Sequence, residues 1–257
     1  MRRISLIILA VTCIIAATTA QAQTVTASKK YITKTVKADN FHSIVVNGSP
    51  TVIYQQKAGA PSIEIYGSDN IVPLIETSVK NGVLTVRFKK NTSIRNVQKL
   101  EVRVTSPRLI EATVKGSGDI EMPKGVKVDG KFTLLVNGSG DINGQNIICE
   151  ELVAKVSGSG DIELKETVAT IIKALVAGSG DIDLTGKCET AIYEVAGSGD
   201  INATRLKATH VTANVRGSGD IECTAIETLT GSSKGSGAVE YKGNPEVNFS
   251  GKGLSRM

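Results

Sequence analysis

Tryptophan is absent from the sequence, and aromatic residues account for only 4% of its 257 positions. Platforms that hold sugars or single-stranded nucleic acid by stacking need aromatic faces, so this composition argues against them. Histidine is also scarce, since only His42 and His210 occur and they lie far apart in the chain. A nucleophilic hydrolase needs a serine or cysteine beside a histidine base, so we expect no such enzyme.

Cysteine is rare as well, with four residues and no Cys-x-x-Cys pair. One of them, Cys13, lies in the apolar segment near the start of the chain; the other three are Cys149, Cys188 and Cys223. These three later cysteines are an odd number without close spacing, which does not suit a thiolate metal site. We therefore expect buried free thiols.

Long apolar runs are missing beyond the first residues. Arg2 and Arg3 precede a run from Ile4 to Ala17, and the exit Ala20-Gln21-Ala22 has small residues where a signal peptidase cuts. This pattern predicts a secretory signal peptide over residues 1–22, and the run is too short to span a bilayer comfortably. Because no later run reaches 18 apolar residues, we expect an exported protein, in the periplasm or at the cell surface, without a membrane span after cleavage.

The charge of the chain is nearly balanced. Removing Arg2 and Arg3 from the 30 basic residues leaves 28 against 25 acidic ones, a net charge of about +3. A protein that neutralises many phosphates carries a larger excess of basic residues, so we expect no nucleic-acid partner.

The most informative feature is an internal repeat. The motif Gly-Ser-Gly-Asp-Ile occurs six times, and a degenerate copy, Gly-Ser-Gly-Ala-Val, begins at Gly235. Successive copies are separated by 22, 20, 20, 19, 20 and 18 residues. The six complete copies begin at Gly116, Gly138, Gly158, Gly178, Gly197 and Gly217. Such a fixed period predicts a repeat architecture in which each unit buries its apolar face against its neighbours.

Apolar residues alternate with polar ones on both sides of each Gly-Ser-Gly corner. Valine stands two residues before the corner in six units, and isoleucine stands four residues after its first glycine, as in Val156 and Ile162. A period of two indicates strands, and identical residues at one phase indicate identical positions in successive coils. Propeller blades need about 40 residues. The sequence therefore predicts an all-β parallel β-helix, a β-solenoid of about 20-residue coils, and parallel crossovers favour right-handed coiling.

The regions beside the array are less regular. We expect a flexible leader over 23–38, an irregular β portion over 39–109 that shares the solenoid core, the regular array over 110–242, and a C-terminal cap over 243–257. The segment Ser43–Tyr54 is a worn copy of the unit, in which Pro50 replaces the second glycine. A separate small β domain in place of the shared core is the alternative for 39–109.

Six aspartates occupy one phase of the array. Carboxylates stacked at a strand spacing of about 5 Å repel one another by roughly 1 to 3 kcal/mol per pair. Hydrogen bonds from corner N–H groups would offset the repulsion, with glycine supplying left-handed backbone angles. A cation ribbon, with calcium bridging adjacent coils, is the alternative. The six candidate ligands are Asp119, Asp141, Asp161, Asp181, Asp200 and Asp220.

Several segments of the sequence resemble those of one known family. They are Phe41–Ser49, Asp69-Asn70-Ile71, Asn81-Gly82-Val83-Leu84 and the Gly-Ser-Gly-Asp-Ile array. Together they are similar to the head GIN domain family of putative auto-transporter adhesins, common in Bacteroidetes, over roughly residues 40–245. The resemblance implies a secreted, β-helical, non-enzymatic protein and supplies no catalytic residues. The chain has no terminal set of alternating strands of about 10 residues, so secretion through a pore of its own is not expected.

Three functions remain open at this stage. The first is a non-enzymatic, adhesin-like module of the cell envelope or surface that binds a protein or glycan ligand, with no catalytic residues and no cofactor other than possible calcium. The second is a carbohydrate-active β-helix enzyme of the lyase or hydrolase type, because aligned aspartates can act in pairs. The third is a purely structural envelope scaffold. The sequence does not name the binding residues or the oligomeric state.

Overall fold

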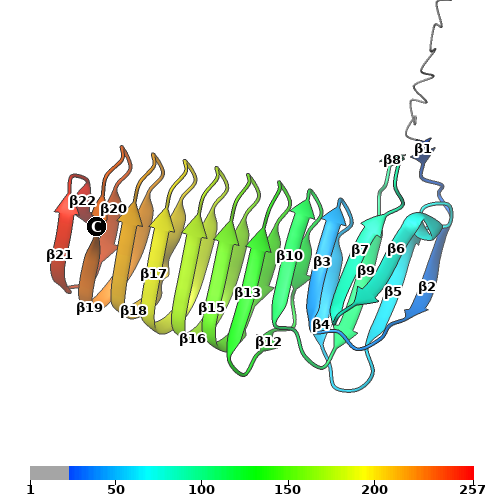
Figure 1. Cartoon of the computed structure of the whole chain (residues 1–257), viewed down its shortest axis with the longest axis horizontal. Helices are drawn as coiled ribbons and strands as arrows, with labels where there is room; N and C mark the ends of the chain where they lie inside the picture. Colours follow the sequence, from blue (N-terminus) through cyan, green and yellow to red (C-terminus); the bar gives the residue numbers. More distant parts are fainter. Residues whose placement is uncertain (1–22) are drawn as a thin grey trace, which may run out of the picture.

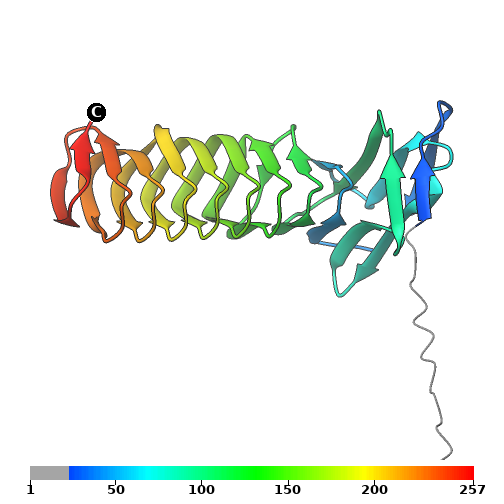
Figure 2. The ribbon, with the colours of Figure 1, turned by 90° about the horizontal axis from the view of Figure 1, so that it is seen from above.

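A computed structural model of the chain describes residues 23–257, which form an elongated β-solenoid with a more irregular β portion at its N-terminal end (Figures 1 and 2). The predicted signal peptide lies outside the described residues. The helical structure within 23–257 is a single 3-10 turn, η1 (Val72–Leu74). No helix in this part of the chain is long and apolar enough to cross a membrane.

The regular array consists of strands that stack in parallel, one coil on the next. Its early coils are broken into short strands. In the later coils, one strand runs from the isoleucine after a corner to the second residue before the next corner. The strands are β10 (Glu111–Gly116), β11 (Ile120–Met122), β12 (Val126–Lys127), β13 (Lys131–Val136), β14 (Ile142–Gln145), β15 (Ile147–Val156), β16 (Ile162–Val176), β17 (Ile182–Val195), β18 (Ile201–Val215) and β19 (Ile221–Ser233).

The register of these strands confirms the predicted solenoid. Val136 pairs with Val156, and Val156 pairs with Val176, so equivalent residues of successive units stack on one another along the solenoid axis. The isoleucines after the corners stack in the same way, and both columns are at most 1% exposed. Burying branched side chains in continuous columns stabilises each coil by about 1.5–3 kcal/mol per side chain, which a lone unit cannot achieve.

The glycines of the corners have a different role from the one expected. Among the first glycines of the Gly-Ser-Gly corners, only Gly116 has a positive φ, of 135°. At Gly138 and its successors, a Cβ atom would instead lie much closer than the van der Waals contact distance to the backbone oxygen of the preceding corner. The prediction of left-handed angles is therefore wrong for most corners, where glycine permits one corner to stack directly on another.

The irregular portion contains two further coils. The worn copy forms β3 (Ser43–Gly48) and β4 (Val52–Gln56), which pair in parallel and in register with β10 and β11. On their other side lie β7 (Val83–Phe88) and β9 (Leu100–Ser106), again in parallel. Figure 1 shows β3 between β10 and β7. Buried residues from Phe41 to Val239 form one apolar cluster through both portions.

Antiparallel strands close the N-terminal end of the solenoid. β5 (Ser62–Ser68) pairs antiparallel with β9, and β6 (Ile75–Lys80) pairs antiparallel with β7. β2 (Tyr31–Lys37) then adds to β5 as an antiparallel edge strand. β1 (Gln23–Thr26) and β8 (Thr92–Arg95) form a separate parallel pair. Residues 23–38 are thus largely strands rather than the flexible leader that the sequence suggested.

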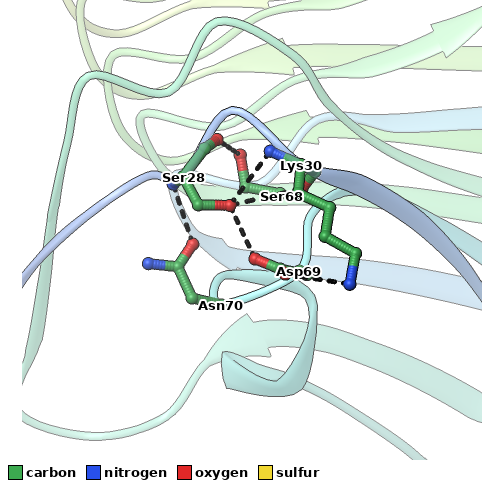
Figure 3. A network of polar contacts seen from close by, with 5 residues as sticks. All are labelled: Ser28, Lys30, Ser68, Asp69 and Asn70. Atoms are coloured by element: carbon green, nitrogen blue, oxygen red, sulfur yellow. Dashed lines mark hydrogen bonds and ion pairs between the residues drawn. The ribbon is translucent and has the colours of Figure 1, made fainter.

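A polar network fixes the segment between β1 and β2 (Figure 3). The Ser28 hydroxyl donates to Oδ1 of Asp69 at 2.6 Å, and the Ser28 N–H donates to Oδ1 of Asn70 at 3.0 Å. The Ser68 hydroxyl donates to the Ser28 carbonyl at 2.7 Å. Because these contacts join residues about 40 positions apart, they hold the segment against the turn after β5.

The C-terminal segment continues the stack rather than covering its end. β20 (Val239–Lys242) and β21 (Glu246–Gly251) pair in parallel with β19, and β22 (Leu254–Arg256) pairs in parallel with β20. The last coil therefore leaves β21 and β22 at the C-terminal end of the sheet (Figure 1). The expected cap over 243–257 is instead an additional coil.

Candidate functional site

The six aspartates of the array form a hydrogen-bonded ladder. In each step, the N–H of one aspartate donates to Oδ1 of the aspartate in the preceding coil. The donor–acceptor distances are 3.0 Å for Asp141 to Asp119, 2.9 Å for Asp161 to Asp141, and 2.7 Å for Asp181 to Asp161, Asp200 to Asp181 and Asp220 to Asp200. The N–H of Ala238 donates to Asp220 at 2.6 Å and ends the ladder.

The ladder gives the aspartates a structural role. The backbone carbonyl of each aspartate accepts a hydrogen bond from an apolar residue of the preceding coil. The donor is the N–H of Val52 for Asp119 and of an isoleucine for the others, as Asp181 O accepts from Ile162 at 3.0 Å. The side chain thus satisfies an N–H group that the corner would otherwise leave unpaired. No group of three or more His, Cys, Asp or Glu side chains within residues 23–257 is arranged to hold a metal ion. Calcium binding by the aspartates stays a prediction.

A second column of polar residues runs beside the ladder, two positions further along each strand. Its members pair in register along the axis and point out of the solenoid; they are Glu121, Asn143, Glu163, Asp183, Asn202, Glu222 and Glu240. We call the ladder and this column together the acidic face. In the second column, the carboxylates accept no backbone hydrogen bond from the residues that the structure describes, and that of Glu163 pairs with Lys165.

The ionised form of the Asp183 side chain is destabilised on the acidic face. Burial is the main cause that raises the pKa of the Asp183 carboxyl, and the carboxylates of Glu163 and Asp181 raise it further. Arg205 acts in the opposite direction but does not cancel the shift. A ligand that brings cationic or hydrogen-bond-donating groups would relieve this repulsion.

The acidic face contains a small hollow at one coil. Gly144 occupies the phase that Met122 and Leu164 fill in the adjacent coils, so the strand carries no side chain there. A depression of about 200 Å³ lies beside it. Its lining combines carboxylates, amides and apolar groups and consists of Glu121, Met122, Pro123, Asn143, Gly144, Gln145, Glu163 and Lys165. Gly144 itself stands at an inward phase, where Leu164 and Met122 fill the space beside it, so its missing side chain gave no sequence signal for this outward depression.

The lysine and glutamine of the hollow are partly engaged. Lys165 forms an ion pair with Glu163 at 2.8 Å, and the Gln145 side-chain amide donates to the Pro123 carbonyl. Glu121 and Asn143 complete its polar rim. A rim of acceptors and one cation suits a ligand rich in hydroxyl or amine groups.

The two histidines do not form a catalytic group. His42 precedes β3, and its Nδ1 lies 3.0 Å from the Ser43 hydroxyl, whereas His210 lies in β18, where its Nδ1 is 3.0 Å from the Thr228 hydroxyl. Ser233 matches a Gly-x-Ser-x-Gly pattern, a match that sequence reasoning missed. Its hydroxyl is buried in β19 and donates to the Gly237 carbonyl at 2.7 Å, so it is not placed as a nucleophile.

The three described cysteines are buried and free, as predicted. Burial raises the pKa of Cys188 and of Cys223 to about 12, and burial together with Glu151 raises that of Cys149 to about 11. Thiols in this state hold their protons at neutral pH and are poor nucleophiles. They belong to the packing of the core rather than to a site.

Solved structures from Bacteroidetes share this architecture. A putative lipid binding protein from Parabacteroides distasonis is 26% identical, with a TM-score of 0.81 and coverage of 91% of this chain and 100% of that one. A putative adhesin from Bacteroides fragilis is 29% identical, with a TM-score of 0.69 and coverage of 90% and 99%. A putative adhesin from P. distasonis is 25% identical, with a TM-score of 0.83 and coverage of 91% and 99%.

The comparison with curated proteins gives no match. A family model described as "Putative auto-transporter adhesin, head GIN domain" matches residues 40–245, which include the worn copy, the second irregular coil and the regular array. The match thus covers most of the chain and confirms the family that the repeated motifs indicated. The chain belongs to the head GIN domain family of adhesin-like proteins.

Proposed function

We propose that the protein is an exported, non-enzymatic binding module that attaches to a protein or glycan surface ligand through its acidic face. The observation that carries the proposal is the second polar column, whose carboxylates accept no backbone hydrogen bond within residues 23–257. Glu121 and Glu163 from this column flank the hollow at Gly144. Burial, and after it the carboxylates of Glu163 and Asp181, raise the pKa of Asp183, so the ionised form of this side chain is not fully stabilised within the fold.

The family match supports a binding role, since both the family and two of the structural neighbours are described as adhesins. The arrangement of side chains supports the absence of catalysis. A carbohydrate-active enzyme needs an acid and a base with separate protonation states in a groove that encloses the sugar. Here the aspartates are committed to backbone N–H groups, and the hollow is shallow.

The experiment that tests this proposal changes the second column and leaves the ladder intact. Replacing Asp161 or Asp181 would mix loss of binding with loss of stability, because both accept ladder hydrogen bonds. We therefore choose the double variant Glu121→Gln/Glu163→Gln. The matched control is Glu189→Gln/Glu227→Gln, which removes two exposed carboxylates away from the hollow.

Both variants and the unchanged protein are screened against immobilised glycans, matrix proteins and lipid vesicles, with melting temperature and release of reducing sugar as further readouts. We expect ligand retention to fall at least ten-fold in the first variant only, with both melting temperatures unchanged. Release of sugar that the first variant abolishes would show an enzyme instead. Binding that neither variant alters would exclude the acidic face as the ligand site.

A further inference from the structure

The two ends of the solenoid differ in how their strand edges are protected. At the N-terminal end, β5, β6 and β2 cover the last parallel coil, and the edge strand β2 carries the exposed residues Lys34 and Lys37. Lysines on an edge strand discourage pairing with another chain. At the C-terminal end, β21 has no such cover within the described residues, and it contains no lysine or proline.

The apolar core is also open at the C-terminal end. Val247 continues the inward column of Leu229 but is 38% exposed, and Phe249 continues the next column and is only partly buried. Leu254 on β22 is likewise partly buried. Exposed side chains at core positions of a solenoid mark a surface that another element covers.

The backbone of β21 is arranged to pair with a further strand. In every regular coil, the carbonyls of inward residues accept hydrogen bonds from the following coil, as Val215 O does from Lys234 N at 2.9 Å. The inward residues of β21 are those in register with Leu229, Gly231 and Ser233, namely Val247, Phe249 and Gly251. Their N–H and C=O groups therefore point out of the end of the sheet.

Two copies of β21 place complementary residues opposite each other when they pair antiparallel. With a two-fold axis at Phe249, Val247 of one copy lies opposite Gly251 of the other, and Phe249 lies opposite Phe249. These are the residues whose N–H and C=O groups are free, so all three positions form hydrogen-bonded pairs. The outward residues then place Glu246 opposite Lys252 of the second copy, and symmetry creates this ion pair twice.

We propose that the C-terminal end of the solenoid is a homodimer interface, in which β21 of two copies pair antiparallel about Phe249. The pairing joins the two apolar cores end to end and covers Val247 and Phe249. Because the N-terminal end is closed by antiparallel strands, the assembly stops at two copies and does not extend into a fibre. This inference does not depend on the proposed ligand site.

Charge reversal at the interface tests the proposal by sedimentation equilibrium of the purified protein over a wide concentration range. We expect a reversible dimer, and Glu246→Lys or Lys252→Glu alone should raise the dissociation constant roughly ten-fold or more, because each places two like-charged pairs in contact. The charge swap Glu246→Lys/Lys252→Glu should restore the dimer. The matched control Lys234→Glu, at the same phase one coil earlier, should have no effect.

Cysteine cross-linking tests the register independently. Asn248 lies opposite Ser250 of the second copy in a pair without mutual backbone hydrogen bonds, where Cα atoms approach to about 4.5 Å, a separation that suits a disulfide. A mixture of the single variants Asn248→Cys and Ser250→Cys should form a cross-linked dimer on mild oxidation, and neither variant alone should do so efficiently. A protein that stays monomeric throughout, or a dimer insensitive to Glu246→Lys, would overturn the proposal.

Discussion

The N–H of Asp181 donates a hydrogen bond of 2.7 Å to Oδ1 of Asp161 in the preceding coil. The same contact recurs along the array, so the aspartate of the repeated motif is the acceptor that closes each Gly-Ser-Gly corner. One carboxylate oxygen is engaged in this way at each step. The motif therefore satisfies a backbone group in each coil that carries the aspartate.

This contact predicts distinct effects for two substitutions of one side chain. Asp161→Ala leaves the Asp181 N–H without its acceptor and should lower the free energy of unfolding by about 1–2 kcal/mol. Asp161→Asn keeps an oxygen acceptor and removes one charge from the column, so its stability should stay close to that of the unchanged protein. Urea denaturation measures both, with Glu189→Ala as the exposed control.

The same variants separate the ladder from a cation ribbon. If the aspartates act only as acceptors, millimolar calcium leaves the melting temperature of the unchanged protein and of Asp161→Asn equal to their values in chelator. A rise in melting temperature with calcium that Asp161→Asn abolishes would instead show that the carboxylates bind the ion.

The corner glycines predict a steric effect. In Gly160→Ala, the new Cβ atom would overlap the carbonyl oxygen of Gly140, and the coils would have to separate. Overpacking of this kind should cost about 3 kcal/mol or more. Gly130→Ala is the control, since nothing lies within 4 Å of a Cβ atom there, and its positive φ alone should cost about 1–2 kcal/mol. Equal losses of stability in the two variants would contradict the stacking of the corners.

The repeat allowed most of the regular fold to be predicted. Alternation of Val156, Ile162 and their equivalents fixed which face of each strand is buried, and the spacing of about 20 residues fixed which residues stack. The worn copy at Ser43–Tyr54 was recognisable because Ile44 and Val46 keep the inward phases. In these segments, the residues that the local alternation predicts to be buried are the ones that the tertiary contacts bury.

The ends of the solenoid could not be predicted in the same way. β7 and β9 stack on β3 and β4 across an insertion, and nothing in their local sequence states that β5 and β6 then pair antiparallel. The contacts that order residues 23–38, such as that of Ser28 with Asp69, join distant parts of the chain, so the local sequence does not show them. The candidate site depends on the ligand chemistry of an exposed face, which periodicity does not specify.

The acidic face predicts a pH dependence at Asp183. The pKa of this carboxyl lies above its ordinary value of 3.8, so the folded state holds the proton more tightly than the unfolded chain does. Ionised Asp183 therefore costs stability, and this cost appears as the pH rises from about 3.8 through the folded-state pKa. We expect Asp183→Asn to melt at a higher temperature than the unchanged protein at pH 7, with the difference shrinking toward pH 4.

Thermal unfolding at a series of pH values measures this difference, and Glu189→Gln provides a control carboxylate that is exposed away from the acidic face. A constant difference at all pH values would mean that the substitution acts through packing and not through ionisation. A lower melting temperature for Asp183→Asn at pH 7 would contradict the repulsion that we infer on this face.

Two buried tyrosines predict stability changes of opposite sign. The Tyr193 hydroxyl has no hydrogen-bond partner within residues 23–257, and burial raises its pKa well above the ordinary value. The Tyr54 hydroxyl, by contrast, lies 3.2 Å from the Ser106 carbonyl and 3.1 Å from its hydroxyl. An unpaired buried hydroxyl costs free energy in the folded state, whereas a paired one contributes about 1 kcal/mol. Tyr193→Phe should therefore raise the free energy of unfolding by about 1 kcal/mol, and Tyr54→Phe should lower it by about the same amount. Urea denaturation midpoints distinguish the two, and a loss of stability in Tyr193→Phe would mean that the phenol pairs with a neighbour such as the Cys188 thiol.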